Sequence, residues 1–178
     1  ITATDTIDYV TIATAGNAAD FGNLTSNAYY LGACSSGTRG LFGGGQRSTS
    51  LDTIDYITIA TTGNATDFGN LSAARLKIAS CPSNVIDYVT IATTGDSTDF
   101  GNLSVGRDFL SSCSNQTYGL FGGGGETTGG KSTTIDYVTI ATPGNATDFG
   151  DLTLATSNLA ACSNGPRGVF GGGETSGG

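Results

Sequence analysis

The sequence predicts an all-β fold made of short strands, and three observations lead to this prediction. First, the stretch TIDYVTIAT at residues 6–14 returns unchanged at 134–142, with near copies at 53–61 and 85–93. Second, Thr, Ile, Val and Tyr, which favour strands, dominate this phrase. Third, no segment carries apolar residues at the spacing of an amphipathic helix over a useful length.

The rest of the chain repeats as well. The IDYVTIAT phrase is followed by a stretch such as GNATDFGNL, then by a short stretch that ends in Cys, and then by LFGGG or VFGGG. Gly, Asn, Ser and Pro separate these phrases, so each phrase is expected to be one strand. We therefore expect a single domain over residues 1–178, with repeats that start near residues 7, 54, 86 and 135.

Both faces of the repeated strand carry apolar side chains. In the first copy, Ile7, Tyr9 and Ala13 lie on one face, and Val10 and Ile12 on the other. A strand that is covered on both faces and recurs at long intervals indicates a sheet stacked between two similar sheets. The radial arrangement of four-stranded antiparallel sheets is the β-propeller, and the repeat count predicts about four blades. A β-solenoid is the alternative, but it usually repeats at a shorter interval.

The repeats are unequally spaced. Successive IDY phrases begin at Ile7, Ile54, Ile86 and Ile135, which gives intervals of 47, 32 and 49 residues. The short interval lacks one GLFGGG strand and its linker. Because antiparallel strands alternate in direction, we expect either a missing stretch or a distorted blade between residues 80 and 87. The chain begins with the third and fourth phrases of a blade and ends after the first and second, so its terminal strands are predicted to share one blade and close the ring.

The order of the phrases resembles the kelch repeat, in which a strand ending in a Gly pair precedes a strand with an aromatic beside an acid. LFGGG and IDYVTIAT are similar to these two strands. Four phenylalanines stand where kelch repeats have Trp, and two arginines where they often have Arg: Phe21, Phe68, Phe100, Phe149, Arg75 and Arg107. Repeats of the type TIDYVTIATTGNATDFGDL also resemble those of structural proteins of aquatic bacteriophages and algal viruses. This resemblance implies a kelch-like β-propeller in a virion.

Composition argues against several classes of function. The net charge of −8 disfavours binding to nucleic acid and to an anionic membrane surface, and no apolar run approaches the length of a membrane span. The absence of His removes the commonest general base. GETTGGKS at 125–132 matches the Walker A pattern, with Lys131 and Ser132 in place, but a phosphate-binding loop needs a following helix and a strand is expected here. The sequence therefore predicts no enzyme.

The acids recur at two positions of the repeat. Calcium bound by these carboxylates is one interpretation, and Asx turns that bond to backbone N–H groups are the other. No Asp-rich loop with alternating ligands occurs, so no cofactor is predicted and calcium is the alternative. The residues are Asp8, Asp55, Asp87 and Asp136 in one phrase, and Asp20, Asp67, Asp99 and Asp148 in the next.

Each repeat also carries one cysteine, in the same phrase. The residues are Cys34, Cys81, Cys113 and Cys162. We expect all four to be buried on equivalent inner strands and unpaired, because repeat-related positions seldom come within disulfide distance. Six Asn-x-Ser/Thr sequons also occur, as is usual in an Asn- and Thr-rich repeat.

The function that the sequence favours is a structural or adhesive propeller module of a virion or other extracellular appendage. Its expected partners are proteins of the same assembly, a cell-surface glycan or receptor, or further copies of the chain. A secreted lectin-like or protein-binding propeller is the alternative. Aromatic residues outside the repeated phrase are candidate ligand contacts, namely Tyr29, Tyr30 and Tyr118. The expected location is extracellular or on the virion surface.

Overall fold

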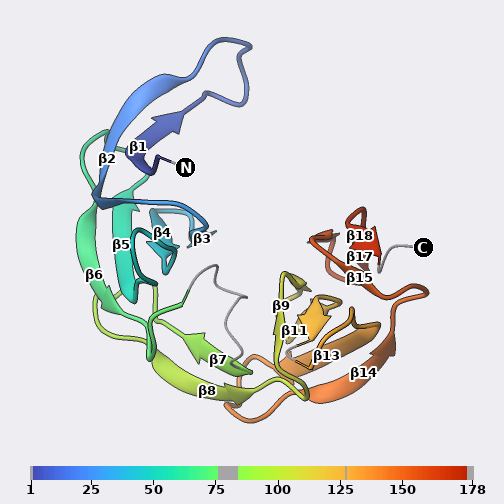
Figure 1. Cartoon of the computed structure of the whole chain (residues 1–178). Helices are drawn as coiled ribbons and strands as arrows, with labels where there is room; N and C mark the ends of the chain where they lie inside the picture. Colours follow the sequence, from blue (N-terminus) through green and yellow to red (C-terminus); the bar gives the residue numbers. More distant parts are fainter. Residues whose placement is uncertain (1, 76–83, 127, 176–178) are drawn as a thin grey trace. The chain divides into compact units, whose positions relative to one another are not determined.

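A computed structural model describes residues 2–75, 84–126 and 128–175 of the chain. It is all-β with antiparallel sheets, as the sequence predicts (Figure 1). The chain divides into two compact units, the first made of Ile1–Ile78 with Val89–Thr98 and the second of Ala79–Tyr88 with Asp99–Gly178.

The first unit holds a two-stranded and a four-stranded sheet. β1 pairs with β2, and the other strands follow the order β3-β4-β5-β6. The bounds are β1 (Thr4–Tyr9), β2 (Ala19–Ala28), β3 (Gly32–Ser35), β4 (Arg39–Gly43), β5 (Thr53–Thr58) and β6 (Thr66–Asn70).

The second unit repeats this arrangement. Its four-stranded sheet has the order β10-β11-β13-β14, and β7 pairs with β8, β9 with β12, β15 with β18 and β16 with β17. β8 starts at the last residue of the first unit. The bounds are β7 (Val85–Tyr88), β8 (Thr98–Asn102), β9 (Arg107–Asp108), β10 (Ser111–Ser114), β11 (Tyr118–Gly122), β12 (Gly125–Glu126), β13 (Thr134–Thr139), β14 (Thr147–Asp151), β15 (Thr156–Ser157), β16 (Ala160–Ser163), β17 (Gly168–Gly171) and β18 (Glu174–Thr175).

Each four-stranded sheet contains the four phrases in the predicted order. The Cys phrase forms the edge strand β3 or β10, the LFGGG phrase β4 or β11, the IDY phrase the interior strand β5 or β13, and the DFG phrase β6 or β14. The terminal sheets are halves of this pattern, because β1–β2 holds the last two phrases and β16–β17 the first two.

The IDY strands are shorter than predicted. The predicted strand over 53–61 ends at Thr58, and the Thr61 N–H donates to the Thr58 carbonyl at 3.1 Å, which closes a turn. The same turn bond joins Thr14 to Thr11, Thr93 to Thr90 and Thr142 to Thr139. The second half of the phrase is therefore the start of a hairpin loop, although its Thr, Ile and Ala residues favour a strand.

A bulge explains why two consecutive residues of the IDY strand are buried. The register between β5 and β6 shifts between Ile54 and Asp55, and these residues are 3% and 6% exposed. A regular strand would turn one of them outward, whereas a bulge turns both side chains toward the interior. β13 has the same shift between Ile135 and Asp136.

The apolar core of the first unit lies in two clusters. In one, Ile7, Phe21 and Leu24 pack against Phe42 and Ile57 of the four-stranded sheet. In the other, Leu41, Ile54 and Phe68 pack with partly buried hydrophobics that include Val89 and Ile91. Apolar side chains from successive repeats thus pack against each other, as expected for stacked sheets.

The short interval between the second and third IDY phrases coincides with a two-stranded sheet, β7–β8. The stretch predicted to be missing or distorted covers residues 80–87, and residues 76–83 lie outside the described part of the chain. This prediction therefore stays a prediction.

Candidate functional site: the junction between repeats

The loops that follow the second, third and fourth IDY strands each lie against the last strand of the preceding repeat. In the first junction the Gly63 N–H donates to the Phe21 carbonyl at 2.7 Å, and the Ala65 N–H to the Asn23 carbonyl at 2.8 Å. The Asn64 side chain completes the contact, because its Oδ1 accepts a hydrogen bond from the Asn23 N–H at 3.0 Å. The loop thus adds two backbone bonds and one side-chain bond to the outer edge of β2.

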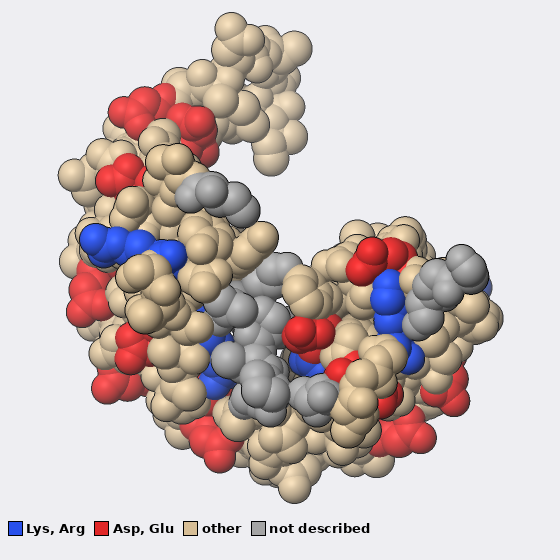
Figure 2. Space-filling model, in the orientation of Figure 1, with Lys and Arg blue, Asp and Glu red and all other residues tan. Residues whose placement is uncertain are grey.

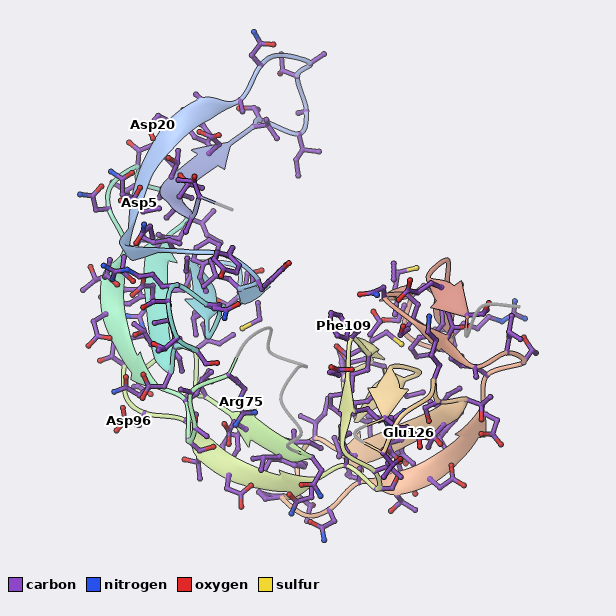
Figure 3. The ribbon with its side chains drawn as sticks, viewed as in Figure 1. Asp5, Asp20, Arg75, Asp96, Phe109 and Glu126 are labelled. Carbon is purple, nitrogen blue, oxygen red and sulfur yellow. The ribbon has the colours of Figure 1, made fainter. Side chains whose placement is uncertain are left out.

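The same junction occurs twice more. In the second, Gly95 donates to Phe68 and Ser97 to Asn70, while Asp96, labelled in Figure 3, accepts from the Asn70 N–H at 2.9 Å. The third uses the same pattern, in which Gly144 donates to Phe100, Ala146 donates to Asn102 and Asn145 accepts from Asn102. Asn and Asp are interchangeable at the middle position because both supply an Oδ1 acceptor.

The glycine of each DFG triplet makes this close approach possible. A Cβ at Gly22, Gly69 or Gly101 would overlap the carbonyl of the docked loop glycine, Gly63, Gly95 or Gly144 respectively. The three DFG glycines also have φ values of 147–148°, which L side chains rarely adopt. The DFG triplet therefore belongs to the strand on which the loop docks. The loop covers the Phe of each triplet, and the exposed fractions of Phe21, Phe68 and Phe100 are 6%, 3% and 8%.

The repeated Asp of the IDY phrase adds a second bond across the same junction. Asp55 in β5 accepts from the Thr25 N–H at 2.9 Å and from its hydroxyl at 2.7 Å. Asp136 in β13 accepts from the Ser104 N–H at 3.2 Å and from its hydroxyl at 2.6 Å. Each Asp thus anchors a Thr or Ser of the preceding repeat, Thr25 within β2 and Ser104 just after β8.

Arg107 joins this cluster in the second unit. Its Nη2 lies 2.7 Å from the Asp136 carboxylate, and both side chains have 0% exposed surface. Its Nη1 donates to the carbonyls of Gly123 at 2.9 Å and Thr134. Burial lowers the pKa of Arg107, and the charge of Asp136 opposes this shift. Both carboxylate oxygens are already hydrogen-bonded, so the cluster holds the sheets together and presents no open carboxylate to a ligand.

The structure therefore gives four of the eight recurring acids structural roles, namely Asp55, Asp136, Asp99 and Asp148. Asp99 and Asp148 each accept from the backbone N–H two residues ahead, Gly101 and Gly150, at 3.0 Å, which is the Asx turn expected from the sequence. Within residues 2–75, 84–126 and 128–175, no group of three or more His, Cys, Asp or Glu could hold a metal ion. Figure 2 shows the acidic side chains spread over the face in view.

The candidate tyrosines belong to different compact units. Tyr29 and Tyr30, in the first unit, contact each other edge to face with ring centroids 5.0 Å apart. Tyr29 also donates to the Arg47 carbonyl at 3.2 Å, whereas Tyr30 is 46% exposed. Tyr118, in the second unit, is 42% exposed and contacts Tyr137.

The Walker A match is a linker, because the strand β13 follows it where a phosphate-binding loop requires a helix. The Lys131 ammonium donates to the Thr175 carbonyl at 2.9 Å and lies 3.3 Å from Glu174. This contact lowers the pKa of Glu174. The lysine thus fastens the short β18 segment to the linker.

The prediction that the cysteines are all buried is wrong for Cys34 and Cys162, which are exposed. The Cys phrases form edge strands, so their side chains are covered only where another sheet packs on them. Cys113 is buried because β17 packs on it. The contact is so close that a Cβ added at Gly168 would lie 2.6 Å from the Cys113 Sγ. All three are free thiols, and Cys81 lies outside the described residues.

Sequence reasoning missed the loop residues of the junction. The available signal was the triplet GNA, which recurs at 16–18, 63–65 and 144–146 at a fixed distance before DFG. A polar phrase that recurs as closely as the apolar ones indicates a contact made by every repeat.

Comparison with known proteins adds no family to this description. The chain matches no family model and no curated protein. Among the described residues, no helix has the length and apolarity that a membrane crossing requires.

Proposed function

We propose that this chain is a non-enzymatic structural or adhesive module of a virion or another extracellular appendage. The observation that carries the proposal is the use of the repeated polar residues. The recurring Asp, Asn, Thr and Ser side chains hold neighbouring repeats together, and two of the four IDY carboxylates, Asp55 and Asp136, are buried with their hydrogen bonds satisfied. A chain that uses its polar repeats in this way is suited to bearing load or to displaying loops.

The architecture proposed for this module is a kelch-like β-propeller. The four-stranded sheets with the IDY phrase inside, and the packing of successive repeats on each other, support radially arranged blades. In this arrangement, β16–β17 and β1–β2 are complementary halves of one blade, because they contain the first two and the last two phrases respectively.

Particle composition tests this function. An antibody against the chain is used to probe the purified particles and the particle-free supernatant of the source culture. We expect the chain to co-purify with particles through a density gradient and to be identified by mass spectrometry of those particles. Recovery only as a soluble protein would contradict the proposal.

A lectin-like or protein-binding module is the second candidate, and the exposure of Tyr30 and Tyr118 favours it. Half-exposed aromatic rings are the usual stacking surfaces for sugars. Binding of the isolated chain to a glycan array, lost in Tyr118→Ala or Tyr30→Ala, would support this candidate. Absence of binding would leave the structural role as the better explanation.

A further inference from the structure

The sequence contains a single Asn-Gly pair, Asn164–Gly165, and the structure places it in the turn between β16 and β17. Both residues are exposed to water. The backbone nitrogen that follows an asparagine can attack the side-chain amide carbon of that asparagine, because the two atoms close a five-membered ring. Glycine leaves this nitrogen least hindered, since it has no Cβ. Every other asparagine of the chain precedes a residue that has a side chain.

The nitrogen of Gly165 is available as a nucleophile. Within the described part of the chain, its N–H makes no hydrogen bond. The residues around it are held, because the Asn164 N–H donates to the Arg167 carbonyl at 3.1 Å. Gly165 has a φ of 97°, which glycine adopts without strain. No hydrogen bond therefore has to break before this nitrogen attacks.

The side-chain amide of Asn164 is held by its oxygen and not by its nitrogen. Its Oδ1 accepts a hydrogen bond from the Arg167 N–H at 3.2 Å, and among the described residues its Nδ2 has no partner. A donor on the oxygen stabilises the negative charge that develops there when a nucleophile adds to the amide carbon. The turn thus polarises the carbonyl and leaves the departing nitrogen unbound.

Two equivalent turns show what folding itself requires at this position. In the β3–β4 turn, Ser36 Oγ accepts from the backbone N–H three residues ahead at 3.1 Å, and in the β10–β11 turn Asn115 Oδ1 does so at 2.7 Å. The turn therefore needs a side-chain oxygen and not an Asn-Gly pair. Asn115 precedes Gln116, and its Nδ2 donates to the Gly165 carbonyl at 3.3 Å. It lacks both the unhindered nucleophile and the free leaving group.

We propose that Asn164 is a site of spontaneous covalent modification by deamidation. The Gly165 nitrogen loses its proton to hydroxide and bonds to the Asn164 Cγ. The bond from Cγ to Nδ2 then breaks, and Nδ2 takes a proton from water and leaves as ammonia. Water opens the resulting succinimide at either carbonyl, which gives aspartate or isoaspartate. Water is the only co-reactant, and no electrons are exchanged with an oxidant or reductant.

The two products have different effects on the hairpin. Aspartate keeps an oxygen for the Arg167 N–H and makes the net charge of −8 more negative by one unit. Isoaspartate adds one carbon to the main chain beside the Ser163–Gly168 pair, and Gly168 is the residue that lies against Cys113. The isoaspartate product therefore loosens the cover of the Cys113 thiol.

Timed incubation of the folded chain at mildly alkaline pH, followed by peptide mass mapping, tests the proposal. We expect Asn164 to deamidate at least about tenfold faster than Asn115, which is the matched asparagine of the neighbouring turn. The rate should rise with pH, because the attacking nitrogen must first lose its proton. Methylation by an isoaspartate-specific methyltransferase identifies the isoaspartate product. Equal rates at the two asparagines would overturn the proposal.

The variant Asn164→Ser separates the reaction from the turn. Serine supplies the capping oxygen, as Ser36 does, but it has no amide to expel. The variant should melt like the parent chain and lose most of the early release of ammonia. Asn115→Ser is the matched control, and it should release ammonia nearly as fast as the parent chain. Early release that is undiminished in Asn164→Ser would overturn the proposal.

The Cys113 thiol reports the structural consequence. Parent chain and Asn164→Ser are incubated for the same time and then alkylated without denaturant. We expect Cys113 to react faster in the incubated parent chain than in the variant, in proportion to the isoaspartate formed. Equal alkylation of Cys113 in the two samples would overturn the loosening of the hairpin.

Discussion

At the scale of single residues, one hydrogen bond between an Asp of the IDY phrase and a Thr or Ser of the preceding repeat occurs twice. Asp55 binds Thr25 and Asp136 binds Ser104, with the carboxylates buried in both cases. A buried carboxylate is tolerated only when its oxygens are hydrogen-bonded or paired with a charge. Asp136 has both kinds of partner, because Arg107 lies beside it.

The ion pair gives the first prediction. Asp136→Ala leaves the Arg107 charge buried without a counter-charge, which costs about 3–5 kcal/mol of unfolding free energy. Urea denaturation measures the loss. The control Asp67→Ala removes an exposed carboxylate and should change stability by less than about 0.5 kcal/mol. Equal losses in the two variants would contradict the burial of this pair.

The same pair can be replaced rather than broken. Arg107→Met/Asp136→Leu removes both charges together, so no unpaired charge remains and much of the stability should return. The Ser104 hydroxyl loses its acceptor in this variant, which keeps the recovery incomplete. A double variant less stable than Asp136→Ala would indicate that the cluster stabilises the chain by more than charge neutralisation.

The thiols give the second prediction. Burial, and to a smaller extent the charge of Cys162, raise the pKa of Cys113 above its ordinary value of 9.0. The thiolate is the reactive form, so less than half of Cys113 is reactive at pH 9.0 and its alkylation rate still rises above that pH. In native protein Cys162 should be alkylated before Cys113, as peptide mass mapping can show. Equal rates in native protein would contradict the packing of β17 on β10.

At the scale of elements, the strand that contains Asp-Phe-Gly serves as the docking strand in each of the three junctions, namely β2, β6 and β8. Its Gly needs both the positive φ and the absence of a side chain. A comparison of Gly101 and Gly150 distinguishes the two requirements. Both have a positive φ, 147° and 138°, but only Gly101 faces a docked loop.

The matched pair Gly101→Ala and Gly150→Ala gives the third prediction. Both variants carry backbone strain, which is about 1–3 kcal/mol for Ala at such a positive φ. Only Gly101→Ala also displaces the Gly144 loop and exposes Phe100, which costs about a further 2 kcal/mol or more. Thermal or urea unfolding should therefore show a larger loss for Gly101→Ala. Equal losses would contradict the docking of the loop.

The elements show how far the sequence could predict the structure. The strand phrases, their order in the sheets and the interior place of the IDY strand follow from composition and punctuation. The end of β5 at Thr58 does not, because residues 59–61 are Ile, Ala and Thr, and only the turn bond stops the strand. The exposure of Cys34 could not be predicted either, since the phrase alone does not show which strand lies at the edge of the sheet. The junction needed the loop and the DFG strand to be considered together, although their repetition was visible.

At the scale of the whole molecule, the second, third and fourth repeats each contact the preceding repeat through the same backbone and Asn or Asp bonds. Stability in such a chain is approximately the sum of the repeats and their nearest-neighbour contacts.

Amide hydrogen exchange of the loop glycines tests this central claim most directly. Gly63, Gly95 and Gly144 donate to strand carbonyls at 2.7–2.8 Å, so their amides should be protected at every protein concentration. Rapid exchange at Gly63, Gly95 and Gly144 would contradict the account.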